Sequence, residues 1–260
     1  MDKLKLIKKI KKLALRFALS GPPVNAKQAR KLALQLAQYG RPENDRQNHD
    51  CPLCGYHGPF KPRFSSQDIR LDGYCPQCGS LERHRHLILW LNEGGPKQFG
   101  RTLHFAPEAC IKDLISSKAS DYLTADFAEG RADLKLNIEA IDMDDASVDT
   151  VIANHVLEHV DDKKALAELY RILRPGGRAI LTFPVISSWP TSYEDPAFVT
   201  EAERHRHFGQ RDHVRYFGWD CTTRIGDAGF ELDIVLANGA DSAKYALARG
   251  GSIFHAVKPV

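Results

Sequence analysis

The stretch DTVIANHVLEHVDDKKALAELYRILRPGGRAILTFP, residues 149–184, determines the fold. Its early part, residues 150–153, is a β-rich run, and Asp161 or Asp162 can cap the helix that follows. An apolar stripe at positions i, i+3, i+4 and i+7 predicts that helix. The stripe consists of Leu166, Leu169, Tyr170 and Leu173. We expect Pro175-Gly176-Gly177 to end the helix and a buried strand to follow, which makes one βαβ unit.

Short apolar runs alternate with helical runs from Arg101 onward, which indicates an α/β fold built on a mostly parallel sheet. The chain has 260 residues, of which 43% are hydrophobic, enough for one domain of ordinary size with appendages. The last two strands flank residues 239–250 and are expected to pair antiparallel. Strands are predicted at residues 101–106, 121–126, 133–138, 149–154, 178–184, 230–236 and 251–257.

The unit resembles the class I S-adenosylmethionine (SAM)-dependent methyltransferases. The resemblance rests on the ordered set of Asp149, Asn154-His155, the Leu-Glu-His-Val of residues 157–160 and the Gly-Gly turn. The alternative is an ordinary βαβ unit of another α/β protein. The resemblance covers about residues 101–257. It implies a Rossmann-like seven-stranded sheet with an antiparallel last strand, a methyltransferase domain over 97–260, and SAM as cofactor.

The carboxyl ends of the strands are where a cofactor is expected in such a sheet. The first strand runs into Phe105-Ala106-Pro107-Glu108, without the Gly-x-Gly-x-Gly loop of the family. Here the resemblance implies that Asp126 accepts hydrogen bonds from the ribose, that Asn137 and Ile138 meet the adenine, and that Asn154 and His155 lie beside the methionine part. The alternative for Asp126 and Asn137 is a turn residue. The cofactor-binding residues predicted in this way are Phe105, Ala106, Glu108, Asp126, Asn137, Ile138, Asn154 and His155.

Two cysteine pairs precede this domain at the spacing of a zinc ribbon, Cys51-x2-Cys54 and Cys75-x2-Cys78. Four thiolates fill a tetrahedral site and leave no place for water or substrate, so the zinc is expected to be structural. The ribbon and its following helix are assigned to residues 46–96. Cys110 and Cys221 are expected to be small buried residues.

An insertion of 34 residues, 185–218, follows the fifth strand and is too long for a plain loop. It is rich in arginine, histidine and acidic residues, which are costly to bury. We predict a polar lid that binds a small oxygen-rich or anionic acceptor; a solvated loop is the alternative. The predicted substrate-binding residues are Glu194, Arg204, His205, His207, Gln210, His213 and Arg215.

Methyl transfer is an SN2 displacement from a sulfonium, so positioning and desolvation are expected to provide most of the rate. A hydroxyl acceptor additionally needs a base. His213 with the adjacent Asp212 is the first candidate, and His207 or His205 is the next.

The N-terminal 45 residues predict two helices, of which residues 3–19 form a basic amphipathic helix. Such a helix suits the anionic inner face of a membrane or packing on protein. The net charge of +3 gives no sign of a polyanion binder overall. No apolar run approaches the ~20 residues of a membrane span, and no signal peptide is recognised, so a cytoplasmic location is expected.

Three functions fit these features. The first is a SAM-dependent methyltransferase that acts on a small molecule such as a sugar or glycan intermediate. The second is RNA methylation, with the ribbon and the Arg-His-Arg-His of residues 83–86 in contact with phosphates, although the aromatic and basic residues do not interleave as a base-stacking platform would require. The third is a non-catalytic SAM-binding module. The sequence sets neither the acceptor nor the oligomeric state.

Overall fold

The structure, a computed structural model, describes residues 47–64 and 69–260. The helices predicted within residues 1–45, including the basic amphipathic one, lie outside the described residues. Among the helices that are described, none combines the length and the apolar character that a membrane span requires.

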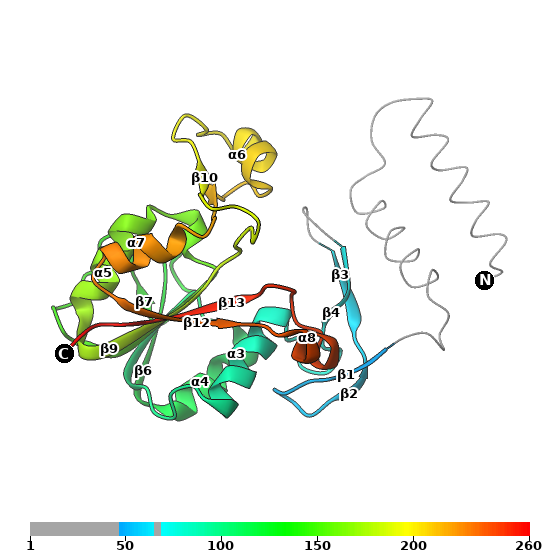
Figure 1. Cartoon of the computed structure of the whole chain (residues 1–260). Helices are drawn as coiled ribbons and strands as arrows, with labels where there is room; N and C mark the ends of the chain where they lie inside the picture. The colour runs from blue at the N-terminus through cyan, green and yellow to red at the C-terminus, as the bar shows by residue number, and fades with distance from the viewer. Residues whose placement is uncertain (1–46, 65–68) are drawn as a thin grey trace, which may run out of the picture.

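A seven-stranded sheet forms the centre of the molecule (Figure 1). Its strands lie side by side in the order β12-β13-β9-β8-β5-β6-β7. Strands β5 to β9 pair parallel, whereas β13 pairs antiparallel with both β9 and β12. The predicted seven-stranded sheet with an antiparallel last strand is therefore confirmed. The strands are β5 (Gly100–Phe105), β6 (Ala119–Asp126), β7 (Leu134–Lys135), β8 (Val148–Asn154), β9 (Leu173–Thr182), β12 (Glu231–Leu236) and β13 (Ser252–Val257).

Helices cover both faces of the sheet (Figure 1). Successive strand residues face opposite sides, so each central strand serves two cores. Ile152 and Ile180 lie in one core with residues of α3 and α4, and Val151 and Leu181 lie in the other with residues of α5 and α7. These helices are α3 (Glu82–Glu93), α4 (Ala109–Lys118), α5 (Asp162–Ile172) and α7 (Cys221–Asp227).

The helix of the opening stretch begins as predicted but ends early. Asp161 is the N-cap of α5, and its side chain accepts a hydrogen bond from the backbone of Lys164. The helix ends at Ile172, and β9 begins at the next residue because Leu173 already pairs with β8. The Pro-Gly-Gly turn instead forms an irregularity within β9, where Gly176 has a φ of 76°. The prediction that this turn ends the helix is wrong.

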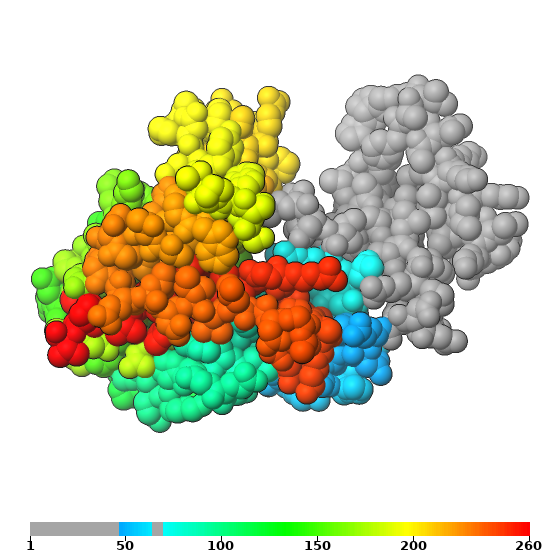
Figure 2. Space-filling model, in the orientation of Figure 1, coloured from blue at the N-terminus to red at the C-terminus, as the bar shows by residue number. Residues whose placement is uncertain are grey.

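The cysteine-rich segment forms two small antiparallel hairpins beside the sheet (Figure 1). Its buried core contains Cys51, Cys75 and Phe60, and Ala246 from the C-terminal part of the chain packs into it. Figure 2 shows the ribbon against the segment that contains α8 (Gly239–Tyr245). The ribbon strands are β1 (Asn48–Asp50), β2 (His57–Pro59), β3 (Lys61–Phe64) and β4 (Ile69–Tyr74).

Arg85 of α3 links the ribbon to the rest of the molecule. Its side chain is fully buried and donates hydrogen bonds to backbone carbonyls from three separate segments. The acceptors are the carbonyls of Ser80 at 2.6 Å, Tyr245 at 2.8 Å, Ala246 at 2.6 Å and Gly73 at 3.5 Å. The planar guanidinium can donate to several carbonyls at once from its separate nitrogens. An ammonium group has a single nitrogen and cannot reach the same set of carbonyls.

The insertion after β9 forms a lobe that stands above the sheet (Figure 1). It contains β10 (Tyr193–Glu194), α6 (Glu201–Phe208) and β11 (Arg215–Tyr216), and β10 pairs antiparallel with β11. An ion-pair network holds its base against α5: Arg215 and Arg224 both contact Asp162 and Glu194, at distances between 2.7 and 3.2 Å.

Candidate active site and metal centre

Two neighbouring strands end in backbone conformations that favour glycine. Ala106, directly after β5, has a φ of 47°, and His155, directly after β8, has a φ of 55°. Each is fixed by a hydrogen bond from its own N–H, to Ala125 at 2.8 Å and to Thr182 at 2.6 Å. Ala106 thus adopts the left-handed conformation that glycine usually supplies. Its small side chain is exposed. This backbone is consistent with close approach of a cofactor at the strand ends.

Glu108 and Asn154, both predicted cofactor contacts, are already bonded within the protein. Glu108 accepts hydrogen bonds from Arg83 at 3.2 Å, His84 at 3.1 Å and Asn154 at 3.0 Å. Burial raises the pKa of Glu108, but the nearby His104 and the hydrogen bond from His84 outweigh it and leave the pKa well below its usual range. Glu108 therefore joins α3, the β5 loop and β8, and we expect it to position the loop.

Replacement of Glu108 by glutamine tests this role through pH. A carboxyl group whose pKa is lowered in the folded state stabilises the protein above its unfolded pKa of about 4.3, and that contribution is lost as the pH falls through the folded value. Glu108→Gln should therefore lower the free energy of unfolding at pH 7 by about 2–3 kcal/mol. Urea unfolding at pH 7 and near pH 3 should show the difference shrinking at low pH. A difference that does not change with pH would contradict an ionised Glu108.

The predicted ribose and adenine residues lie at the outer edge of the sheet. Asp126 ends β6, and its Oδ1 accepts a hydrogen bond from Ala128 N at 2.8 Å. Asn137 is exposed, and its Oδ1 accepts from Glu139 N at 3.0 Å, while Ile138 is buried. Each side-chain oxygen retains a second lone pair for a ligand donor. Because the chain turns between Asn137 and Ala140, β7 is only Leu134–Lys135, much shorter than the predicted strand 133–138.

Phe127 was missed by reasoning from the sequence. It directly follows Asp126, and the residue is 75% exposed. A flat apolar ring beside a candidate ribose acceptor offers a stacking face for a purine. The signal in the sequence was a large aromatic residue immediately after a strand-end acid.

A cavity of about 200 Å³ opens beside His155 and Thr182, at the carboxyl ends of β8 and β9. The ribbon, α3, the loop before β13 and the insertion complete its walls. Its charged residues are four arginines and one glutamate, and Glu82 is paired with Arg70 at 3.1 Å. The charged and amide side chains that line it are Arg63, Arg70, Glu82, Arg83, Arg249 and Gln210.

The basic run of residues 83–86 divides between this cavity and the interior. Arg83 and His86 line the cavity. His84 and Arg85 are buried, and their nitrogens already bond to protein atoms. The run is therefore no continuous surface for nucleic-acid phosphates.

The predicted substrate-binding residues are spread over the lobe. Gln210 lines the arginine-rich cavity. Glu194, Arg204 and Arg215 line a second cavity of about 600 Å³ at the base of the lobe, where Arg215 and Glu194 are bonded to each other. His205 is exposed on α6.

The three predicted catalytic residues do not form one group. His213 is buried, and its ring meets that of His159 edge to face at 4.7 Å. Asp212 contacts His159, with 3.4 Å between its Oδ2 and Nδ1 of His159. The Nδ1 of His207 lies 2.8 Å from the hydroxyl of Tyr193 on the lobe. No hydrogen bond or ion pair joins the side chains of His213 and Asp212 among the described residues; Asp212 is exposed while His213 is buried.

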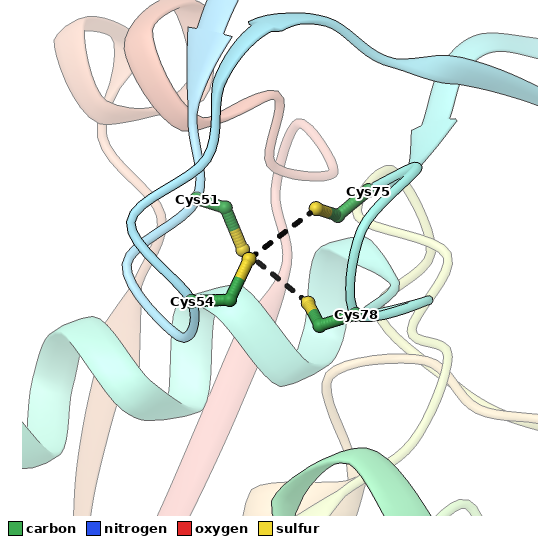
Figure 3. A group of neighbouring side chains, drawn as sticks. All are labelled: Cys51, Cys54, Cys75 and Cys78. Carbon is green, nitrogen blue, oxygen red and sulfur yellow. Dashed lines mark hydrogen bonds between the residues drawn. The ribbon is translucent and has the colours of Figure 1, made fainter.

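The four ribbon cysteines meet at one point (Figure 3). Their sulfurs lie within 4.8 Å of one another, with 3.6 Å between Cys51 and Cys78 and between Cys54 and Cys75. A tetrahedron of zinc–sulfur bonds of about 2.3 Å has edges of about 3.8 Å, so the spacing fits zinc. Both pairs are followed by a glycine in the left-handed conformation, with φ values of 73° and 72°.

Cys110 and Cys221 stand apart from this cluster, in α4 and α7. Burial raises the pKa of Cys110 to about 11 and that of Cys221 to about 12. Thiols of such high pKa are poor nucleophiles. Cys221 is buried as predicted, whereas Cys110 is only half-buried and its Sγ lies 2.9 Å from Nδ1 of His84.

The chain resembles known proteins over its sheet. Residues 103–181 match the family described as a methyltransferase domain. A probable S-adenosylmethionine-dependent methyltransferase of Mycolicibacterium smegmatis is 28% identical over 159 residues, which are 55% of this chain and 57% of that protein. The ubiquinone/menaquinone biosynthesis C-methyltransferase UbiE of Escherichia coli is 30% identical over 112 residues, which are 38% of this chain and 45% of that protein.

Among solved structures, that of the (4+2)-cyclase SpnF has a TM-score of 0.51 at 15% identity and covers 72% of this chain and 87% of that one. This likeness concerns the fold alone. The sheet has the topology of the Rossmann-like class I methyltransferase fold. Residues 103–181 thus match a methyltransferase domain, and the chain spans about half the length of the curated relatives it matches.

Proposed function

We propose that the chain transfers the methyl group of SAM to a small anionic acceptor. The observation that carries this proposal is the arginine-rich cavity beside the strand ends. Three of its arginines, Arg63, Arg70 and Arg83, come from the ribbon and α3, and Arg249 comes from the loop before β13. Arg83 is paired with Glu108 and Arg70 with Glu82, whereas the exposed Arg249 has no ion pair among the described residues, so the cavity can offer a guanidinium to a phosphate- or carboxylate-bearing ligand.

Its size favours a small group. Pockets for drug-sized ligands are about 300–1,000 Å³, whereas this cavity is about 200 Å³. A cavity of this size suits the charged part of an acceptor. In this proposal the atom that receives the methyl group lies near His155, where the cavity meets the proposed SAM site. Because the leaving group of SAM is already positive, holding the acceptor in line and excluding water is the main task of the protein.

We further propose that the four ribbon cysteines bind a structural zinc ion. The donor set is complete, since four thiolates leave no open position for a substrate. In this proposal the metal fixes the ribbon, and the ribbon in turn fixes Arg63 and Arg70 at the cavity.

Binding of SAM tests the first half of the proposal. Asp126→Ala should weaken SAM binding about 10- to 100-fold, because charge-assisted hydrogen bonds to the ribose are lost. Isothermal titration calorimetry measures the change. Asp144→Ala removes an exposed carboxylate from the loop after Ile141 and serves as a matched control. Equal affinities for both variants would contradict the assigned ribose contact.

Turnover tests the acceptor class. Formation of S-adenosylhomocysteine should occur with phosphorylated or carboxylated small acceptors and not with their neutral counterparts. Arg249→Ala should raise KM for such an acceptor about tenfold with a smaller change in kcat, because this exposed arginine has no ion pair with the described residues. Arg211→Ala, on the exposed face of the lobe, is the matched control.

The other functions predict different results in the same assays. If RNA is the acceptor, S-adenosylhomocysteine should form with RNA and not with small anionic molecules, and binding should weaken steeply as the salt concentration rises. SAM binding without turnover on any acceptor would indicate a non-catalytic module.

A further inference from the structure

A second group of metal-type ligands lies away from the cysteines. Glu158, His159 and His213 each offer a ligand atom, and these atoms lie within 4.8 Å of one another. Glu158 and His159 belong to the short 3-10 helix Leu157–His159 after β8, and His213 comes from the insertion just before β11. One carboxylate and two imidazoles are a donor set that divalent transition metals accept.

The buried atoms of this group lack partners. The side chain of Glu158 is 2% exposed, and its Oε2 has no hydrogen-bond partner within residues 47–64 and 69–260. The Nδ1 of His213, in a residue that is 2% exposed, likewise has none in the described part of the chain. An unbonded buried carboxylate oxygen and an unbonded buried imidazole nitrogen are each costly, and a bound cation satisfies both at once.

Neighbouring residues hold the ligands as a metal site requires. Nδ1 of His155 lies 3.0 Å from Oε1 of Glu158, which leaves Oε2 for a metal. Nδ1 of His159 lies 3.4 Å from Oδ2 of Asp212 and 3.3 Å from the Asp212 carbonyl oxygen. Contacts of this kind to carboxylates and carbonyls fix the tautomer and orientation of metal-binding histidines.

The site is accessible to a cation. His159 is 30% exposed on its side chain and lines the second cavity, of about 600 Å³. Five acidic and three basic side chains line that cavity, and Asp162 and Glu194 among them are paired with Arg215 and Arg224. Its acidic residues are Glu139, Asp161, Asp162, Glu194 and Asp195, and its basic ones are Lys163, Arg204 and Arg215.

From these contacts we infer that Glu158, His159 and His213 form a binding site for a divalent transition metal ion such as Zn²⁺, Mn²⁺ or Co²⁺, separate from the cysteine cluster. The three ligands leave coordination positions open to water or to an anionic group entering from the second cavity. The site also ties the insertion to the strand-end helix, because the ligands come from both. It does not depend on the proposed acceptor or on methyl transfer.

The experiment is cobalt binding to the full-length chain. The apoprotein is dialysed against Co²⁺, and bound metal is counted by mass spectrometry while the absorption spectrum is recorded. Thiolate-bound Co²⁺ gives intense near-ultraviolet charge-transfer bands, whereas a nitrogen and oxygen site adds weak visible bands. The wild type should bind one Co²⁺ more than His213→Ala, and the thiolate bands should be the same in both.

A second ligand variant and a control variant test the same site. His159→Ala removes a half-exposed ligand and should also lose one Co²⁺ per chain, even if His213→Ala fails to fold as judged by circular dichroism. His205→Ala removes an exposed histidine of α6 and should bind as much Co²⁺ as the wild type. Equal cobalt content in the wild type, His159→Ala and folded His213→Ala would overturn the site and indicate that water satisfies the buried atoms.

Discussion

Replacement of Arg85 by alanine should lower the free energy of unfolding by about 3–5 kcal/mol. Four backbone carbonyls that now accept hydrogen bonds from this side chain would remain buried, and each unsatisfied group costs about 1–3 kcal/mol before the structure relaxes. The guanidinium also lies 4.6 Å from the ring centre of Phe60 in the ribbon core, so packing is lost as well. Urea unfolding followed by circular dichroism measures the change.

Arg85→Lys is the informative control. It keeps the charge and most of the apolar stem but cannot reach all the carbonyls with one planar group. It should therefore recover only part of the lost stability. If lysine restored the wild-type value, charge rather than the geometry of the guanidinium would explain the buried position.

Loss of the zinc ion proposed for the four cysteines should lower the stability of the ribbon at least as much. Structural zinc in small domains contributes about 10–16 kcal/mol of apparent binding free energy at pH 7, so its loss unfolds the segment that depends on it. Cys75→Ser, at a fully buried ligand, should lower the zinc content and expose the ribbon to limited proteolysis. Addition of a strong chelator to the wild type should have the same result.

Cys221→Ser provides the comparison, since this cysteine is equally buried but lies outside the cluster. It should keep the zinc and the resistance to protease. Because Arg63 and Arg70 come from the ribbon, the chelated protein should also lose affinity for an anionic acceptor while SAM binding through Asp126 persists. Zinc-free protein with an intact ribbon would contradict the structural role of the metal.

Local and repetitive signals made the sheet and the cysteine cluster predictable. Strand periodicity, the Asp161 cap and the spacing of the two cysteine pairs each depend on residues close in sequence, and all three agree with the structure. The end of α5 was misplaced because Leu173 satisfies the helical stripe and the first pairing of β9 equally well. Tertiary pairing with β8 determined the outcome.

The arginine-rich cavity could not be predicted because its walls come from distant parts of the chain. Arg63 and Arg249 are far apart in sequence, and only the packing of the ribbon on the segment around α8 places them at one cavity. The Glu158 group illustrates the same limit. Its acid and first histidine are adjacent in the sequence, but His213 reaches them only through the fold of the insertion.

The contacts of Arg85 also set an order of events during synthesis. Two of its four acceptors, the carbonyls of Tyr245 and Ala246, belong to the last part of the chain, about 160 residues after the arginine. The cysteines can bind a metal ion soon after they leave the ribosome, but the buried arginine remains without these acceptors until Tyr245 and Ala246 have emerged. Contacts of such sequence separation form slowly. Ribosome-bound chains that stop before residue 245 should therefore hold a metal-bound ribbon that has not yet docked.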